Sequence, residues 1–197
     1  MAAGSQAVRE GYPEALVAVH FANPENADNY MTYASKFEYY SLDYDVFATS
    51  YYPYWHGTPA ELFDNLQNCR RFGKKIMVME LGYGFTTEAY TLGGEQKRLV
   101  SDPERAYVPG VTEKYPMSPE GQSAFITDFL ALAEENEIDG IFYWEPLWLP
   151  GEGICWASEA GQEYIHEEGK STSNEWANQC LFDYEGKKLP AFDAFAI

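Results

Sequence analysis

The chain has 197 residues, of which 46% are hydrophobic and 17% aromatic, and its formal net charge is −18. This length predicts one domain, and the negative charge excludes nucleic acid as a partner because phosphate binding needs clustered lysine and arginine. No apolar stretch reaches the roughly 18 residues of a membrane span, so no membrane contact is expected. The opening residues, MAAGSQAVREGYPE, lack the basic and apolar regions of a signal peptide.

The first 42 residues predict a helix end, a strand and a second helix. Residues 4–11 are typical of the end of a helix closed by Gly11. Residues 16–19 form an apolar run that ends at His20, and buried parallel strands are apolar throughout rather than alternating. Residues 25–42 then carry apolar and aromatic side chains at roughly helical spacing, which predicts the second helix.

The central stretch, residues 43–86, predicts a strand, a helix and a strand. Residues 46–50 and 76–79 are apolar runs, and between them Thr58 and Glu61 form a capping-box pattern ahead of apolar residues at helical spacing. This order is a βαβ unit. Such units keep functional groups at the carboxyl ends of their strands. The residues found there are Tyr51, Tyr52, Tyr54, Trp55 and His56 after the first run, and Glu80 after the second.

The second half of the chain contains two long segments without a clear period, residues 87–119 and 147–174. Connections of this length are unusual and are often functional. Between them, Ser118 and Pro119 open a predicted helix, and a strand follows that ends at Trp144 and Glu145. The tail predicts a turn at Gly186 and a short C-terminal helix.

Four predicted strands therefore end near His20, Ser50, Glu80 and Trp144, with helices between them. This pattern indicates an α/β fold and half of a (β/α)₈ barrel, in one domain over residues 1–197. Four strands cannot close a barrel, so the two outer strands are expected to be open edges. We expect an exposed sheet face to carry Val17, Val19, Phe47, Val78, Ile141 and Tyr143.

Five ordered segments carry a family resemblance. They read DYDVFATSYYPYWHG, VMELGYGFT, YPMSPEGQ, GIFYWEPLW and WANQCLFDYEGKKL. Together they resemble the endo-β-1,4-galactanases, the arabinogalactan endo-β-1,4-galactosidases of glycoside hydrolase family 53. The resemblance implies strands five to eight of a TIM barrel from the large retaining-glycosidase clan, which cleaves the β-1,4-galactan side chains of pectin. It also implies an extracellular, secreted protein.

The resemblance assigns roles to residues at the strand ends. Glu80 matches the nucleophile at the end of strand seven, and Trp144 matches the tryptophan that lines the cleaved-bond subsite. Either Tyr51 or Tyr52 is expected to hydrogen-bond Glu80 and hold it ionised and aimed. The full set of expected contacts with galactan or galacto-oligosaccharides is His20, Tyr51, Tyr52, Trp55, His56, Trp144 and Glu145.

The same comparison predicts a missing group. The general acid/base of the family is a Glu after an Asn at the end of strand four, and this chain is expected to begin after that strand. The pairs at residues 136–137 and 174–175 stand at unsuitable places. Residues 81–84 read LGYG where the family commonly has Thr-Ala-Tyr-Pro, which leaves the conformation of that loop open. The expected partner is the N-terminal half or a second copy of the chain.

Each assignment has a structural alternative. A lone Glu80 at a strand end is often only solvated or salt-bridged. Trp144 fits a barrel core, and His20 fits a satisfied core histidine. Trp55 and His56 fit a role in shaping their loop, and Glu145 fits a hydrogen bond to nearby backbone. For the whole chain, the alternative function is a catalytically silent fragment that binds galactan.

No cofactor is expected to be required, and three cysteines show no metal-type spacing. Cys69 is predicted to lie in the core, whereas Cys155 and Cys180 either form a disulfide or stay unpaired. The family resemblance permits a calcium ion in the loop after strand eight, at residues 147–174. Acidic residues are plentiful there, but no ligand spacing is clear.

Overall fold

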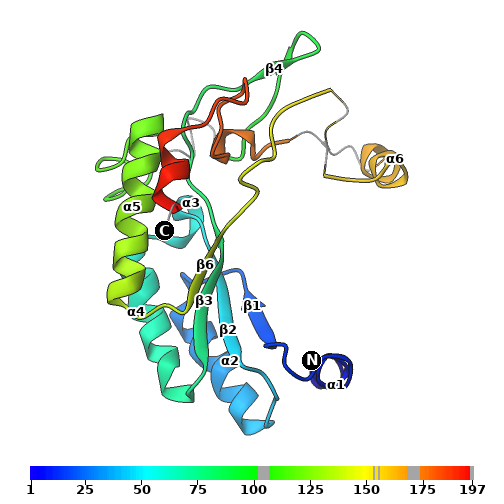
Figure 1. Ribbon diagram of the computed structural model, residues 1–197, viewed down its shortest axis with the longest axis vertical. Coiled ribbons are helices and arrows are strands. Elements are labelled where there is room, and N and C mark those ends of the chain that lie inside the picture. The colour runs from blue at the N-terminus through cyan, green and yellow to red at the C-terminus, as the bar shows by residue number, and fades with distance from the viewer. Residues whose placement is uncertain (102–106, 153, 155, 168–173, 196–197) are drawn as a thin grey trace. The chain divides into compact units, whose positions relative to one another are not determined.

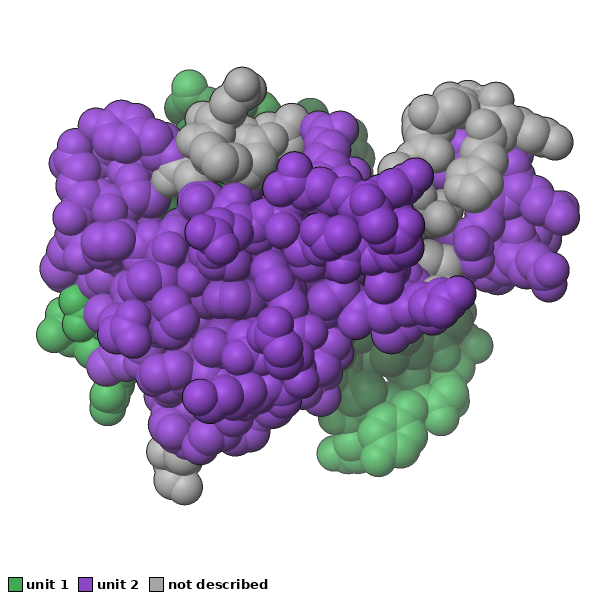
Figure 2. Space-filling view, turned by 90° about the horizontal axis from the view of Figure 1, so that it is seen from above, with its two compact units in different colours: residues 1–82, 128–144 green, residues 83–127, 145–197 purple. Residues whose placement is uncertain are grey.

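A computed structural model describes residues 1–101, 107–152, 154, 156–167 and 174–195. The chain forms two compact units, coloured separately in Figure 2. Unit 1 comprises Met1–Gly82 and Asp128–Trp144, and unit 2 comprises Tyr83–Thr127 and Glu145–Ile197. No helix in the described part of the chain is long and apolar enough to cross a membrane.

Unit 1 is built on a parallel sheet of four strands in the order β1-β2-β3-β6 (Figure 1). The strands are β1 (Ala18–Phe21), β2 (Val46–Tyr51), β3 (Lys75–Leu81) and β6 (Gly140–Tyr143). All six residues of β2 are buried, as expected for an inner strand. The predicted α/β fold with a parallel sheet is confirmed, and so are the four predicted strands.

One face of this sheet is packed by helices (Figure 1). They are α2 (Ala27–Tyr39), α4 (Pro59–Cys69) and the second half of α5 (Pro119–Glu135). Tyr30 of α2 meets Phe47 edge to face, with 5.3 Å between the ring centroids. Phe129 of α5 stacks on Tyr51, with 5.2 Å between the centroids. Phe63 of α4 packs on Phe129 at the same distance of 5.2 Å, so aromatic contacts join the layers.

The start of α4 follows the sequence prediction. The Thr58 hydroxyl accepts the Glu61 N–H, while the Glu61 carboxylate accepts the Thr58 N–H at 2.7 Å. This capping box satisfies two donors that the helix leaves unpaired. A short 3₁₀ turn, η1 (Arg70–Phe72), ends the helical segment at Gly73, whose φ of 69° favours glycine.

The N-terminal helix α1 (Ala2–Gly11) is tied to the start of β2 by charge. The Arg9 guanidinium donates to Asp43 at 3.0 Å and to Asp45 at 2.8 Å. Asp45 also accepts the Val17 N–H at 2.7 Å, just before β1. These contacts connect α1 to the N-terminal ends of β1 and β2.

Two expectations about burial in the sheet are wrong. Residues 16–19 are not a buried run, because Leu16 is 56% exposed and Ala18 is exposed, which follows from β1 pairing only with β2 in unit 1. The predicted exposed face is also reversed. Val19, Phe47 and Val78 are buried, since paired residues share a face and Phe47 lies against α2. The more exposed face instead carries Ala18, His20 and Phe142, the last 54% exposed.

Unit 2 contains elements that the sequence did not predict. Within residues 87–119, β4 (Thr91–Leu92) and β5 (Glu95–Gln96) form a hairpin closed by Gly93 and Gly94, both at positive φ. Within residues 147–174, α6 (Glu159–Glu167) is helical. The expected turn at Gly186 is present, and the tail ends in 3₁₀ turns, η2 (Ala177–Gln179) and η3 (Pro190–Phe195), rather than an α-helix.

Buried amides hold unit 2 together. The Gln122 amide donates to the carbonyls of Tyr83 at 2.8 Å and Cys180 at 3.0 Å. Asn178 accepts the Phe85 N–H at its carbonyl and donates from its amide to the Thr86 carbonyl, both at 2.8 Å. The family-like segments LGYGFT and WANQ therefore meet through hydrogen bonds, which gives the tail segment a structural role.

We expect Phe129→Ala to lower the free energy of unfolding by about 3–5 kcal/mol, because it removes a buried ring that joins β2 to α4. Tyr39→Ala is the control, since Tyr39 is highly exposed on α2 and its loss is expected to cost under about 0.5 kcal/mol. Urea unfolding followed by circular dichroism measures both. Equal losses would contradict this packing.

Candidate active site

A one-residue irregularity in β3 decides where Glu80 points. Thr49 of β2 pairs with Val78, but the next residue, Ser50, pairs with Glu80, so Met79 is an extra residue in β3. The pairing with β6 shows the same irregularity between Val78 and Leu81. Such a bulge reverses the alternation of side chains beyond it. Glu80 therefore shares a face with Ser50, opposite the helices, instead of lying under them.

Two neighbouring strands supply the partners of the Glu80 carboxylate. The Tyr52 hydroxyl, just past β2, donates to Glu80 Oε2 at 2.9 Å. His20 of β1 brings its Nε2 to 4.0 Å from Oε1. The Glu80 side chain keeps 24% of its surface exposed, so it is partly desolvated yet open to a ligand. A hydroxyl donating to a carboxylate is a charge-assisted bond, which holds one oxygen and leaves the other free to react.

His20 is fixed by a residue that the sequence analysis did not single out as functional. Its Nε2 lies 2.9 Å from the hydroxyl of Ser50, which is buried on β2. The ring is exposed enough to reach solvent, with 32% of its side-chain surface accessible. His20 is thus neither a sealed core histidine nor a free one, and Ser50 orients it beside Glu80. The position of Ser50 at a strand end was the available signal.

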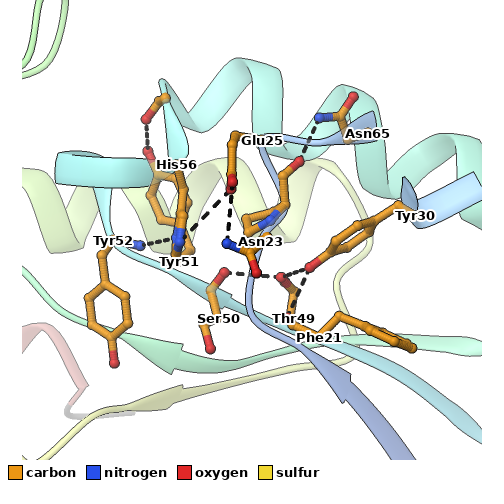
Figure 3. A network of polar contacts seen from close by, with 12 residues as sticks. Phe21, Asn23, Glu25, Tyr30, Thr49, Ser50, Tyr51, Tyr52, His56 and Asn65 are labelled. Carbon is orange, nitrogen blue, oxygen red and sulfur yellow. Dashed lines mark hydrogen bonds and ion pairs between the residues drawn. The ribbon is translucent and has the colours of Figure 1, made fainter. Parts of the chain in front are cut away.

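His56 is buried, with 6% of its surface exposed. Figure 3 shows it between Tyr52 and Glu25. Its Nδ1 accepts the backbone N–H of Tyr52 at 3.0 Å. Its Nε2 lies 3.9 Å from the carboxylate of Glu25, a residue of the β1–α2 loop that sequence reasoning missed. Burial lowers the pKa of His56, against the opposing charges of Glu25 and Glu80. A polar loop directly after a strand end was the signal for Glu25.

The two tyrosines at the end of β2 have different places. Tyr51 is fully buried on the helix side, where it stacks on Phe129 and donates its hydroxyl to the Gly57 carbonyl at 2.8 Å. Tyr51 was expected to contact substrate, but in this structure its side chain exposes no surface to a ligand. The tyrosine that hydrogen-bonds Glu80 is Tyr52. Alternation along an extended chain sends neighbouring side chains to opposite faces.

The remaining predicted contacts lie at or beyond strand ends. Trp55, in the short helix α3 (Pro53–His56), is 41% exposed and meets Tyr52 edge to face at 5.6 Å. Trp144 follows β6, donates its backbone N–H to Leu81 at 2.8 Å and is 36% exposed. Glu145 belongs to unit 2 and has a left-handed backbone with φ of 49°.

The described residues show no group of three or more His, Cys, Asp or Glu side chains that would hold a metal ion. The permitted calcium site falls partly on residues 153, 155 and 168–173, which lie outside the described residues. Cys155 lies outside them too, so its pairing stays a prediction. Cys69 is buried in α4, as predicted.

The lowered pKa of His56 predicts a pH-dependent stability. In the unfolded chain His56 has an ordinary histidine pKa of about 6.5, so it binds a proton more readily there than in the folded chain. The contribution of His56 is therefore fully present above about pH 6.5 and is lost as the pH falls toward the folded pKa. We expect urea unfolding at several pH values to show this loss of stability. In His56→Asn, the part of the loss that His56 causes is expected to disappear. An unchanged pH profile in the variant would contradict the assignment.

Comparisons with known proteins match nearly the whole chain. The family model described as glycosyl hydrolase family 53 matches residues 1–195. An endo-beta-1,4-galactanase of Bacillus subtilis (strain 168) is 37% identical over 98% of this chain and 47% of its own length. An arabinogalactan endo-beta-1,4-galactanase of Cellvibrio japonicus (strain Ueda107) is 30% identical over 89% of this chain and 42% of its own length.

Solved structures agree on the fold. The GH53 catalytic domain of Ignisphaera aggregans superposes with a TM-score of 0.76 and 32% identity, over 96% of this chain and 48% of that one. A thermostable mutant xylanase of Cellvibrio japonicus, at a TM-score of 0.57 and 13% identity, covers 98% of this chain and 51% of its own and shares the fold alone. The chain spans about half the length of the curated relatives it matches. The family model and these relatives confirm the resemblance seen in the sequence: the chain belongs to glycosyl hydrolase family 53.

Proposed function

We propose that this chain carries the nucleophile of a retaining endo-β-1,4-galactanase, on strands five to eight of a (β/α)₈ barrel. The observation that supports this most is the bulge that turns Glu80 to the face away from the helices. There its carboxylate meets Tyr52 and His20, at the carboxyl ends of three neighbouring parallel strands. Two relatives of this chain are named as galactanases.

In the proposed reaction Glu80 attacks the anomeric carbon of a galactosyl unit. The bond from that carbon to the bridging oxygen breaks, and a carboxylic acid protonates the departing oxygen. The product is a glycosyl ester on Glu80, which water then hydrolyses while the second carboxylate takes its proton. Tyr52 holds one oxygen of Glu80, so the other is the attacking atom. In this proposal the partly exposed His20 ring, held beside Glu80 by Ser50, hydrogen-bonds a sugar hydroxyl near the reacting carbon.

The second carboxyl group must lie about 5 Å from the first in a retaining enzyme. The groups found around Glu80 in unit 1 are a tyrosine and a histidine, which do not fill that role. Glu137 lies ahead of β6, at the amino end of that strand, and Glu175 belongs to unit 2. We propose that the acid/base comes from the half of the barrel that the longer relatives possess.

The proposed substrate is β-1,4-galactan or a galacto-oligosaccharide. Trp55 and Trp144 each present part of an indole to solvent, and flat aromatic faces suit the apolar faces of sugar rings. A polymeric pectin side chain lies outside cells, so the proposed location is extracellular. The proposed partner is the N-terminal half of the barrel. A second copy of this chain would add another Glu80 but no acid/base.

A mechanism-based label tests the role of Glu80. A 2-deoxy-2-fluoro-galactobioside with a 2,4-dinitrophenyl leaving group needs no acid to depart, so the nucleophile alone forms the ester. We expect mass spectrometry to find the sugar on the Glu80 peptide. The chain is labelled after co-expression with the unmatched half of the Bacillus subtilis relative, and galactan hydrolysis is measured by reducing-sugar release.

Glu80→Gln is expected to abolish the label and lower hydrolysis by at least about 10⁴-fold. Glu88→Gln removes the same charge from an exposed residue of unit 2 and is the matched control. A label on another residue, or hydrolysis by Glu80→Gln equal to that of Glu88→Gln, would refute the proposal.

We expect Trp144→Ala to weaken binding of β-1,4-galacto-oligosaccharides by roughly 1–3 kcal/mol, the scale of losing an aromatic contact at a binding site. The half-exposed ring at the end of β6 motivates this value. Calorimetric titration of the variant against wild type measures it. Unchanged affinity with an intact circular dichroism spectrum would return Trp144 to a role in packing.

A further inference from the structure

The main chain of Tyr52 is held at two points by one residue, His56. The His56 backbone N–H donates to the Tyr52 carbonyl at 3.0 Å, and His56 Nδ1 accepts the Tyr52 N–H at 3.0 Å. Tyr52 is the extended residue ahead of α3, where its N–H has no helical partner. These two bonds close a ring around one turn of chain and fix the direction in which the Tyr52 side chain leaves it. Figure 3 draws the bond from Tyr52 to the His56 ring.

Only one protonation state of His56 permits this arrangement. Nδ1 accepts a hydrogen bond when it carries no proton, so the neutral ring has its proton on Nε2, which faces Glu25 at 3.9 Å. A second proton would sit on Nδ1 and point at the Tyr52 N–H, placing two donors head to head. The bond to Tyr52 would then be lost.

The surroundings of His56 balance opposing effects. Glu25 approaches from the β1–α2 loop and Glu80 from β3, and both charges favour the imidazolium. Burial, with the rings of Tyr51, Tyr52 and Trp55 nearby, favours the neutral form and has the larger effect. The sequence predicted that His56 contacts substrate. In this structure His56 is almost wholly covered and offers little surface to a ligand.

We infer that His56 is a positioning residue, whose neutral imidazole holds the Tyr52 backbone so that the Tyr52 hydroxyl stays on the Glu80 carboxylate. The inference rests on the proposed function of Glu80. The link runs His56 Nδ1 to Tyr52 N–H, then Tyr52 O–H to Glu80 Oε2 at 2.9 Å, and both steps are direct hydrogen bonds. Glu25, whose carboxylate lies 3.9 Å from His56 Nε2, adjusts how readily His56 takes up a proton.

A double-mutant cycle tests this link in the chain co-expressed with the unmatched half of the Bacillus subtilis relative. His56→Leu removes the acceptor and is expected to lower kcat/KM for galactan by about 10–100-fold, the scale of misplacing a reacting group. In a Tyr52→Phe background, which already lacks the hydroxyl, His56→Leu is expected to add less than about threefold. In His56→Asn the amide Oδ1 replaces Nδ1 as acceptor, so this variant is expected to keep most of the wild-type activity. Its activity is expected to fall less steeply at acid pH, because the titration of His56 is gone.

A second readout does not depend on hydrolysis. In wild type we expect the Tyr52 amide resonance to titrate with His56, to stop titrating in His56→Asn, and to shift its midpoint to lower pH in Glu25→Gln. Full additivity of His56→Leu with Tyr52→Phe, or a Tyr52 amide indifferent to His56, would overturn the inference. No hydrolysis by any variant, with the amide still titrating, would instead overturn the proposed function and support the hydrogen-bond link.

Discussion

The bulge at Met79 is the constraint on which the arrangement around Glu80 depends. In an unbroken ladder Glu80 would pair with Tyr51 and point toward the helices, where Leu81 now lies fully buried. A carboxylate there would lose its water among aromatic rings, at a cost of several kcal/mol unless it were paired or neutralised. One extra residue places the apolar Leu81 in the core and the carboxylate on the opposite face, so the same irregularity serves stability and chemistry.

The residues that meet Glu80 come from neighbouring strands for the same geometric reason. Parallel strands end together, and side chains in register share a face, so His20 and Ser50 align with Glu80 without any contact in sequence. Tyr52 joins them because it follows β2 and lies on the opposite side from Tyr51. The two adjacent tyrosines therefore have different roles. Tyr51 packs in the core, and Tyr52 hydrogen-bonds the Glu80 carboxylate.

Much of unit 1 was predictable because its signals are local. The capping box of Thr58 and the apolar runs at 46–50 and 76–79 each report a nearby constraint, and the structure confirms the elements they predicted. The bulge was not predictable, since residues 76–79 are apolar throughout and show no alternation that a shift would break. The choice between Tyr51 and Tyr52 was left open because it depends on facing directions. The hairpin around Gly93 was missed although the Gly93-Gly94 pair is a usable turn signal.

The family-like segments divide into two physical kinds. Asn178 of WANQ bonds directly to Phe85 and Thr86 of LGYGFT within unit 2, which gives this contact between the two segments a role in packing. DYDVFATSYYPYWHG and the segment around Glu80 instead bring polar groups together on one face of a sheet, where Ser50 and Tyr52 are covered and Glu80 is partly exposed. On that face Phe142 is exposed beside a carboxylate that is only partly desolvated. Electrostatic catalysis is strongest where water is excluded. Under the proposed function, further barrel strands would therefore cover Phe142, deepen the site around Glu80 and bring the acid/base within reach, which joins the fold and the chemistry in one requirement.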